Sequence, residues 1–182
     1  MQALMFWSVV LPGADVPLEG ERGILVAERE RGAVRVDLYR PTNRVGPHPL
    51  IVLVHGGAWF VGTSNDYQDF VHHFAIAGYA TASVDFRLVP EDGFYGQVQD
   101  IKDTIRWLRL NAAAYHLDPT RIGLFGSSSG GHLAGLVAAT GNGEGLGIDP
   151  PGTSSAVDAA FLLYGVYDLT TWVPNPVVRA YT

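Results

Sequence analysis

The sequence predicts an α/β fold in which a mostly parallel sheet carries helices on both of its faces. From Leu50 onward, strand-like and helix-like segments alternate, which is the pattern of parallel strands joined by crossover helices. The run Leu50 to Val54 is continuously apolar, as expected of a central strand buried on both faces. With 182 residues, of which 47% are hydrophobic, the chain is expected to form one globular domain, residues 1–182.

Two strands are predicted before this alternating region. Ile24 to Ala27 is short and apolar, whereas Val34 to Tyr39 alternates apolar with mostly polar residues, as a half-buried strand does. Pro41 to Pro49 holds three prolines and a glycine, so this segment is expected to be a loop. The central strand follows it directly.

Two helices are predicted from capping and spacing. The first is expected to begin at Asn65, with Gln68 completing a capping box, and to end near Gly78, where a glycine can terminate the last turn. The second, Gln99 to Ala114, carries apolar residues at spacings of four, three and four, so one of its faces should be buried. Between the two helices, Ala80 to Asp85 is predicted as another strand.

The remaining elements continue the alternation. Arg121 to Phe125 is predicted as a strand, and Gly131 to Ala139, which is rich in small residues, as a helix directly after it. Gly141 to Ser155 carries five glycines and two adjacent prolines, so it is expected to be a flexible connection, with a substrate-gating role as the alternative. Val157 to Tyr164 is the last predicted strand, and Thr170 to Thr182 is expected to be an irregular tail.

Composition argues against several classes of function. The formal net charge of −6 and the absence of clustered Lys and Arg argue against a nucleic-acid partner. The chain has no cysteine, which excludes disulfides, thiolate catalysis and cysteine-based metal sites. No apolar run reaches the ~18 residues of a membrane span, and Met1 to Leu11 lacks the basic start of a signal peptide. The protein is therefore expected to be soluble and cytoplasmic, without a membrane partner, and homo-oligomer formation is left open.

A candidate catalytic serine lies where an apolar strand meets the following helix. Residues 126–130, GSSSG, match the pattern G-x-S-x-G with Ser128 at the centre. The match lies between the strand Arg121 to Phe125 and a helix, which is the context that a nucleophile elbow requires. There a strained serine projects its hydroxyl above the sheet, and small neighbours let strand and helix pack closely. The alternative is a serine- and glycine-rich turn that only caps the helix.

A second motif, HGGAW at residues 55–59, directly follows the central strand. Glycines allow a backbone to turn its amides toward a substrate. Amides placed in this way stabilise the negative charge that develops on a carbonyl oxygen during acyl transfer, and one such donor can contribute ~3 kcal/mol. The candidate oxyanion hole consists of the amides of Gly56, Gly57, Ala58 and Ser129. A plain turn at the end of the strand is the alternative.

Three segments resemble a known family: HGGAW (55–59), DFRLVPE (85–91) and GSSSGGHLAGL (126–136). In order and spacing they are similar to the hormone-sensitive-lipase-like esterases of the α/β-hydrolase fold, and most similar to the branch of feruloyl esterase-like, acetyl-xylan esterase-like and kynurenine-formamidase-like enzymes. The resemblance runs from about Val34 to about Leu169. It implies a serine carboxylester hydrolase, with no metal and no cofactor, that cleaves a small-molecule ester through an acyl-enzyme. An amidase or formamidase of the same fold and a catalytically inactive binding module are the alternatives.

The chain departs from the family pattern at several positions. Ala58 stands where glycine is common, Ser127 where Asp, Glu or Gly is usual, and Ser129 where Ala is usual. All three are small, so the elbow and the amide donors should survive. The family places its catalytic acid after a seventh strand and its histidine after an eighth. Both strands are expected to be lacking here, so the chain is interpreted as a C-terminally truncated fragment that is weakly active or inactive.

None of the six histidines is expected to serve as the base. His55 has a structural role in the family, and His132 lies one helical turn past Ser128, where it would not face the hydroxyl. Asp168, after the last strand, is a candidate acid, with capping of its own turn as the alternative.

Two further arrangements are expected near the site. Asp85 and Arg87, which follow a strand, are predicted to pair with each other. The aromatic residues Trp59, Phe60, Phe94 and Tyr95 could line an acyl or aromatic pocket, with ordinary packing as the alternative.

Overall fold

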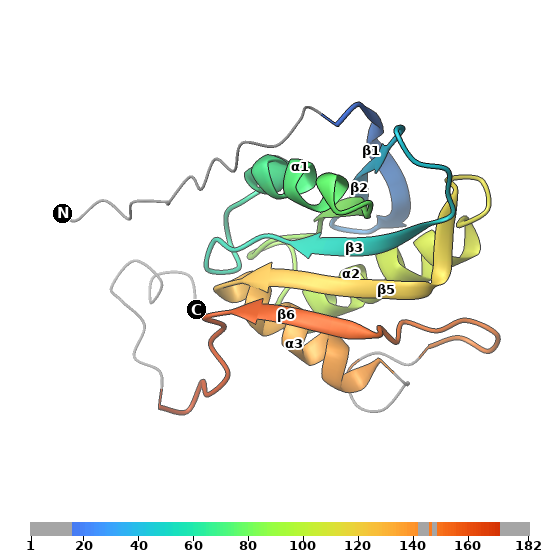
Figure 1. Ribbon diagram of the computed structural model, residues 1–182. Coiled ribbons are helices and arrows are strands. Elements are labelled where there is room, and N and C mark those ends of the chain that lie inside the picture. Colours follow the sequence, from blue (N-terminus) through green and yellow to red (C-terminus); the bar gives the residue numbers. More distant parts are fainter. Residues whose placement is uncertain (1–15, 142–145, 147–148, 172–182) are drawn as a thin grey trace, which may run out of the picture.

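The computed structural model describes residues 16–141, 146 and 149–171. Its sheet contains six strands in the order β1-β2-β4-β3-β5-β6 (Figure 1). The strands are β1 (Leu18–Arg29), β2 (Gly32–Pro41), β3 (His48–Val54), β4 (Ala80–Asp85), β5 (Leu117–Ser127) and β6 (Ala159–Leu163). The helices are the 3₁₀ turn η1 (Ser64–Tyr67), α1 (Gln68–Ile76), α2 (Phe94–Leu110) and α3 (Ser129–Thr140).

The sheet is antiparallel at its first edge and parallel elsewhere. β2 pairs antiparallel with both β1 and β4, whereas β3 pairs parallel with β4 and β5, and β5 pairs parallel with β6. This confirms the predicted sheet, mainly parallel after a first hairpin. Among the described residues no seventh strand pairs with β6, so β6 forms the second edge.

Helices cover both faces of the sheet, as predicted. Leu50, Val52 and Val54 of β3 belong to a core shared with α2 and α3. Leu53, the residue that points the other way, packs in a second core with Val71 of α1. Figure 1 shows α1 on one side of the sheet and α2 and α3 on the other. The continuous apolar run of β3 is therefore explained by burial on both faces.

The first helix is capped differently from the prediction. Thr63, and not Asn65, is the N-cap: its hydroxyl accepts from the amide of Asn65, and the carboxylate of Asp66 accepts from the amide of Thr63. The capping box therefore starts two residues earlier and opens a 3₁₀ turn that leads into α1. The predicted end is confirmed, because Gly78 follows the last turn at φ +89°.

The second helix is shifted toward the N-terminus, the strands β1, β2, β3 and β5 extend beyond their predicted limits, and β6 is shorter than predicted. α2 begins at Phe94 instead of Gln99 and ends at Leu110 instead of Ala114. β5 begins at Leu117, four residues early, and β3 includes His48, which was assigned to the preceding loop and is buried. The pattern of β2 also holds only in part, since Asp37, expected on its outer face, is buried and bonded to the amide of Gly23.

A buried lysine and a half-buried arginine hold the glycine-rich loop that follows α3. The fully buried Lys102 donates from Nζ to the carbonyl oxygens of Thr140, at 2.7 Å, and Leu146, at 2.5 Å. Arg109 donates to the carbonyl oxygens of Ser154 and, at 2.8 Å, Ala156. Within the described part of this loop there is neither helix nor strand, as predicted.

Much of the predicted tail, residues 172–182, lies outside the described residues, as does the start of the chain up to residue 15. In the part of the chain that the structure describes, no helix combines the length and the apolar character needed to cross a bilayer.

Candidate active site

Ser128 occupies a strained turn between β5 and α3. Its φ of 55° and ψ of −125° lie where residues other than glycine are rare, a conformation that costs on the order of 1–3 kcal/mol. Two backbone hydrogen bonds hold it there: the Ser128 amide donates to the Leu163 carbonyl at 2.9 Å, and the His132 amide donates to the Ser128 carbonyl at 3.0 Å. Ser128 itself is partly exposed. The conformation expected of a nucleophile elbow is therefore present.

Glycines on both sides of Ser128 allow the close packing that this turn needs. A Cβ atom on Gly126 would lie 2.5 Å from the carbonyl oxygen of Gly130. A Cβ atom on Gly130 would collide with the carbonyl oxygens of Val54 and His55. Helix α3 therefore begins in direct backbone contact with β5 and with the end of β3, which only glycine permits at these two positions.

The loop after β3 is also forced into an unusual backbone conformation. Gly57, Ala58 and Trp59 have φ values of 121°, 51° and 71°, so three successive residues are left-handed. The amides of Phe60 and Val61 both donate to the carbonyl oxygen of Gly57, which closes the turn. A Cβ on Gly57 would collide with the carbonyl oxygen of Val61, so glycine is required there on steric grounds.

This loop lies against the serine turn, and the amides of Gly57 and Ala58 face no acceptor within the described part of the chain. β3 and β5 are parallel neighbours paired up to Val54 and Gly126, so both loops leave the same edge of the sheet. A Cβ on Gly56 would lie 3.4 Å from the Cβ of Ser128. Among the described residues, the amides of Gly57, Ala58 and Ser129 have no hydrogen-bond acceptor. Ser129 is the first residue of α3, where helix amides are unpaired in any case and favour negative charge.

Two buried histidines support this loop, and the Nδ1 atom of each is engaged in a contact with it. His55 stacks on Phe86 with ring centroids 4.4 Å apart, and its Nδ1 lies 2.8 Å from the carbonyl oxygen of Gly56. His132 accepts at Nδ1 from the indole of Trp59 at 3.2 Å. Burial lowers the pKa of both histidines below the usual value, so both favour the neutral form.

The other four histidines lie away from the serine. His48 begins β3 and His116 immediately precedes β5, so both are at the edge of the sheet opposite Ser128. They are neighbours there, since the amide of His48 donates to the carbonyl of His116 at 2.8 Å. His72 and His73 lie on α1 with exposed side chains.

The aromatic residues form a chain of ring contacts beside the loop. Trp59 is buried and meets His132 edge to face at 5.5 Å, and His132 lies 6.3 Å from Phe94. Phe94 packs on Tyr95 at 4.1 Å, and both keep substantial exposure, 36% and 64%. Phe60 packs at the border of the main core. Trp59 and Phe94 therefore both meet His132, which no pattern in the sequence had connected to them, whereas a pocket lined by the four aromatic rings stays a prediction.

Arg87 and Asp85 each bind a partner other than the one predicted. Arg87 does not pair with Asp85: it forms a bidentate ion pair with Asp100, which is fully buried on α2, and contacts Asp92. Asp85 instead accepts from the amide of Ser64 at 2.5 Å. The prediction failed because the partner of Arg87 lies on the next helix, and Asp85 faces η1.

Asp168, the candidate acid, is exposed and bonded within its own turn. Its carboxylate accepts from the amides and hydroxyls of Thr170 and Thr171. These bonds hold the pKa of Asp168 at about 2. This is the arrangement of a residue that caps its own turn.

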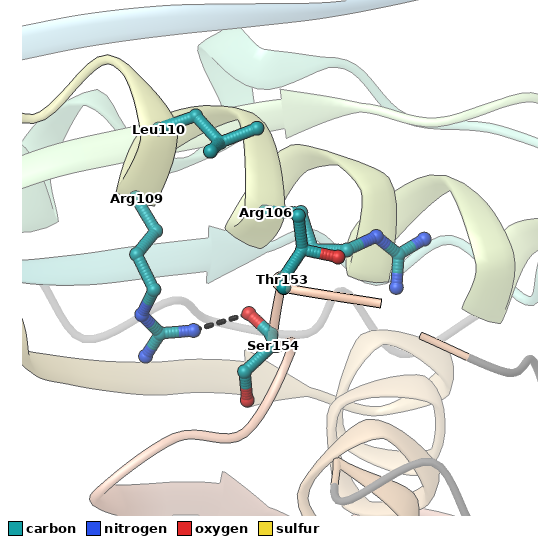
Figure 2. A pocket seen from close by; sticks show the side chains of 6 residues that line it. Arg106, Arg109, Leu110, Thr153 and Ser154 are labelled. Carbon is teal, nitrogen blue, oxygen red and sulfur yellow. Dashed lines mark hydrogen bonds between the residues drawn. The ribbon is translucent and has the colours of Figure 1, made fainter. Parts of the chain in front are cut away.

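A surface hollow of about 250 Å³ lies far from Ser128, next to the end of α2 (Figure 2). Arg106 and Arg109 line it, but their guanidinium groups already bind protein oxygens. Arg106 pairs with Asp103 and Asp149, and Figure 2 shows Arg109 bonded to the carbonyl of Ser154. Arg109 also donates to the carbonyl of Pro119, near the start of β5, so the hollow belongs to the opposite edge of the sheet.

Sequence reasoning missed one side chain at the serine turn. Tyr67, the last residue of η1, places its hydroxyl 2.7 Å from the Oγ of Ser127. No motif signals this tyrosine. The only sequence hint was the unusual serine at position 127.

Comparisons with known proteins show which family the chain is similar to. The family model BD-FAE matches residues 36–180, well over half of the chain. Over 156 residues the chain is 32% identical to a probable isoprenylcysteine alpha-carbonyl methylesterase, ICMEL1, of Arabidopsis thaliana, covering 85% of this chain and 32% of that protein. Over 125 residues it is 34% identical to esterase LipC of Mycobacterium tuberculosis, covering 67% of this chain and 31% of LipC.

A solved structure is similar as well. The apo form of esterase 2 from Thermogutta terrifontis matches with a TM-score of 0.70 and 27% identity, over 93% of this chain and 62% of that one. The chain spans about a third of the length of the curated relatives it matches.

Proposed function

The chain belongs to the BD-FAE family of α/β-hydrolase-fold esterases, and on this premise we propose that it carries the nucleophile and the oxyanion hole of a serine carboxylester hydrolase. The Oγ of Ser128 attacks the carbonyl carbon of a small ester, and the carbonyl oxygen becomes an oxyanion held by the amides of Gly57, Ala58 and Ser129. A base, which imidazole can supply from solution, takes the Oγ proton and passes it to the leaving alcohol, and then takes a proton from the water that releases the acid from the acyl-enzyme.

One observation carries this proposal: a partly exposed serine at φ 55° lies against a left-handed loop in which the amides of Gly57 and Ala58 have no acceptor among the described residues. Each feature is costly or uncommon by itself. Their coincidence at the shared edge of β3 and β5 has a simple explanation in acyl transfer, where an attacking hydroxyl and two or three backbone donors must meet one carbonyl group.

The proposal includes a second part, that none of the six histidines of this chain is the base. What supports it is their placement: two lie at the opposite edge of the sheet, two lie on α1, and His55 and His132 use Nδ1 for bonds to the loop. The carboxylate of Asp168 is engaged by four hydrogen bonds within its own turn. Without its base, a serine hydroxyl is a weak nucleophile, although an oxyanion hole alone can leave ~10³–10⁴-fold acceleration over water.

Chemical rescue tests both parts together. The chain is incubated with p-nitrophenyl acetate, with and without imidazole as an external base, and acetylation is located by mass spectrometry in wild type and Ser128→Ala. We expect slow acetylation of Ser128 that imidazole accelerates, and none at that peptide in the variant.

The outcomes separate the two parts. Fast acetylation of Ser128 that imidazole does not change would mean that a histidine of the chain serves as base, and His132→Ala would be the first variant to examine. Absence of acetate on Ser128 under all conditions would remove the nucleophile assignment itself.

A further inference from the structure

A buried tyrosine reaches the serine turn from a different element. Tyr67 is only 6% exposed, and its ring packs edge to face on Phe70 and Phe125. Its hydroxyl makes two contacts with one residue: it accepts from the amide of Ser127 at 3.0 Å and lies 2.7 Å from the Oγ of Ser127. Ser127 directly precedes the strained Ser128.

The hydroxyl of Tyr67 supplies the hydrogen-bond acceptor that β3 no longer offers to the end of β5. Ser128 donates its amide to Leu163 on the β6 side of β5, and successive amides of a strand point to opposite sides. The amide of Ser127 therefore faces β3, whose pairing with β5 stops at Val54 and Gly126. Without the tyrosine this amide would have no partner from the sheet, and an unpaired buried amide costs ~1–3 kcal/mol.

The tyrosine is held in place by polar contacts at the other end of η1. The amide of Ser64 donates to Asp85, its hydroxyl donates to the buried carboxylate of Asp37 at 2.9 Å, and its carbonyl accepts from Ser83 at 2.8 Å. These three partners lie on β2 and β4, so η1 is fixed to the sheet. Burial raises the pKa of Tyr67, so the hydroxyl keeps its proton at neutral pH.

We propose that Tyr67 is a positioning residue, whose hydroxyl clamps Ser127 at its amide and its Oγ and so keeps Ser128 in the strained conformation. The oxygen of Tyr67 accepts from the amide, and either hydroxyl can donate in its contact with the Oγ of Ser127. The inference rests on the proposed function in one respect, because the strain has a use only if Ser128 reacts. A left-handed serine relaxes unless its surroundings fix it, and a displacement of ~1 Å at a reacting atom can lower a rate 10²-fold.

Three single-atom or near-isosteric variants separate the clamp from packing. Tyr67→Phe removes the hydroxyl and keeps the ring in its cluster. Ser127→Ala removes only the Oγ and leaves the amide bond to Tyr67. Tyr79→Phe is the matched control, because the ring of Tyr79 also packs on a phenylalanine, Phe74, and its hydroxyl has no hydrogen-bond partner among the described residues.

Two measurements are made on each variant: hydrogen exchange of the Ser127 amide by NMR, and the imidazole-supported rate of Ser128 acetylation as a function of ester concentration. In Tyr67→Phe we expect faster exchange and a maximal acetylation rate lower by ~10–100-fold, with an unchanged half-saturating ester concentration. Ser127→Ala should keep the slow exchange and lose less rate. Tyr79→Phe should behave as wild type.

The proposal fails if Tyr67→Phe exchanges and reacts as wild type does, or if its rate is unchanged while only its melting temperature falls, since a merely structural role would do the latter. If wild-type Ser128 is never acetylated, the proposed function fails. The exchange of the Ser127 amide then still decides whether the hydroxyl holds the turn.

Discussion

The contacts of the buried Lys102 ammonium group determine how much its removal should lower the free energy of unfolding. Lys102→Met keeps a side chain of similar length and removes the charge. The side chain is fully buried, and its Nζ donates to the carbonyl oxygens of Thr140, the last residue of α3, and Leu146. The variant leaves both carbonyl groups without this donor.

The expected loss follows from two opposing terms. Hydrogen bonds from a charged group contribute ~1.5–3 kcal/mol each, so two of them amount to ~3–6 kcal/mol. Burying a cation costs several kcal/mol, and methionine avoids part of that cost. We expect the free energy of unfolding to fall by about 2–4 kcal/mol, or about 4–16 °C in Tm at ~2–4 °C per kcal/mol for a chain of this size.

The pH dependence provides a second signature. Burial lowers the pKa of Lys102 below its ordinary value of 10.5. Between the folded and the unfolded pKa, the unfolded chain binds more protons, so stability rises with pH through that window. The methionine variant should lose this rise. Burial raises the pKa of Tyr67 and Tyr115, so their titration lowers stability at still higher pH, but it does so in both proteins.

Urea denaturation at several pH values between 7 and 10 measures both effects. Arg121→Met is the matched control, because it removes an exposed cation that pairs with Asp118, and such pairs contribute under ~1 kcal/mol. If Lys102→Met costs no more than Arg121→Met, or keeps the rise with pH, the reasoning about the two carbonyl bonds is refuted.

Three further predictions concern the frame of the site. Arg87→Gln should lower the free energy of unfolding by about 3–5 kcal/mol in urea, because the buried carboxylate of Asp100 loses its bidentate partner, and Asp100→Asn in the same chain should restore part of it. Gly130→Ala should reduce the melting temperature and the acetylation of Ser128 together, since overpacking costs ~1–3 kcal/mol; Gly93→Ala, where a Cβ meets open space, should change neither. The hydrogen bonds of Asp168 hold its pKa at about 2, against 3.8 ordinarily. Its contribution to the stability of the fold should therefore be present above about pH 4 and disappear as the pH falls through 2. Asp168→Asn should therefore flatten the acid limb of a stability curve, and an unchanged limb would contradict this.

The sequence predicted best where local pattern and tertiary contact agree. The bounds of β4 were correct because its run of small and apolar residues is buried along nearly its whole length and ends at a carboxylate. The elbow and the loop after β3 were located by motifs, since their backbone geometry admits few residue types. The predicted order of strands and helices followed from the alternation that any parallel sheet imposes.

The errors arose where contacts distant in sequence decide the structure. The first turn of α2 has no side-chain cap at Gly93, and its residue Gln97 is held by a bond from Nε2 to the carbonyl of Trp59. The pairing of Arg87 with Asp100 and the hold of Tyr67 on Ser127 likewise join separate elements. No periodicity or cap signal in one sequence reports such contacts.

Lys102 is the only lysine in the sequence, and its side chain is fully buried. Acylating reagents that seek ε-amines should consequently find no target on the native surface. The rate at which the Lys102 amine is modified would instead report how often local unfolding exposes the core.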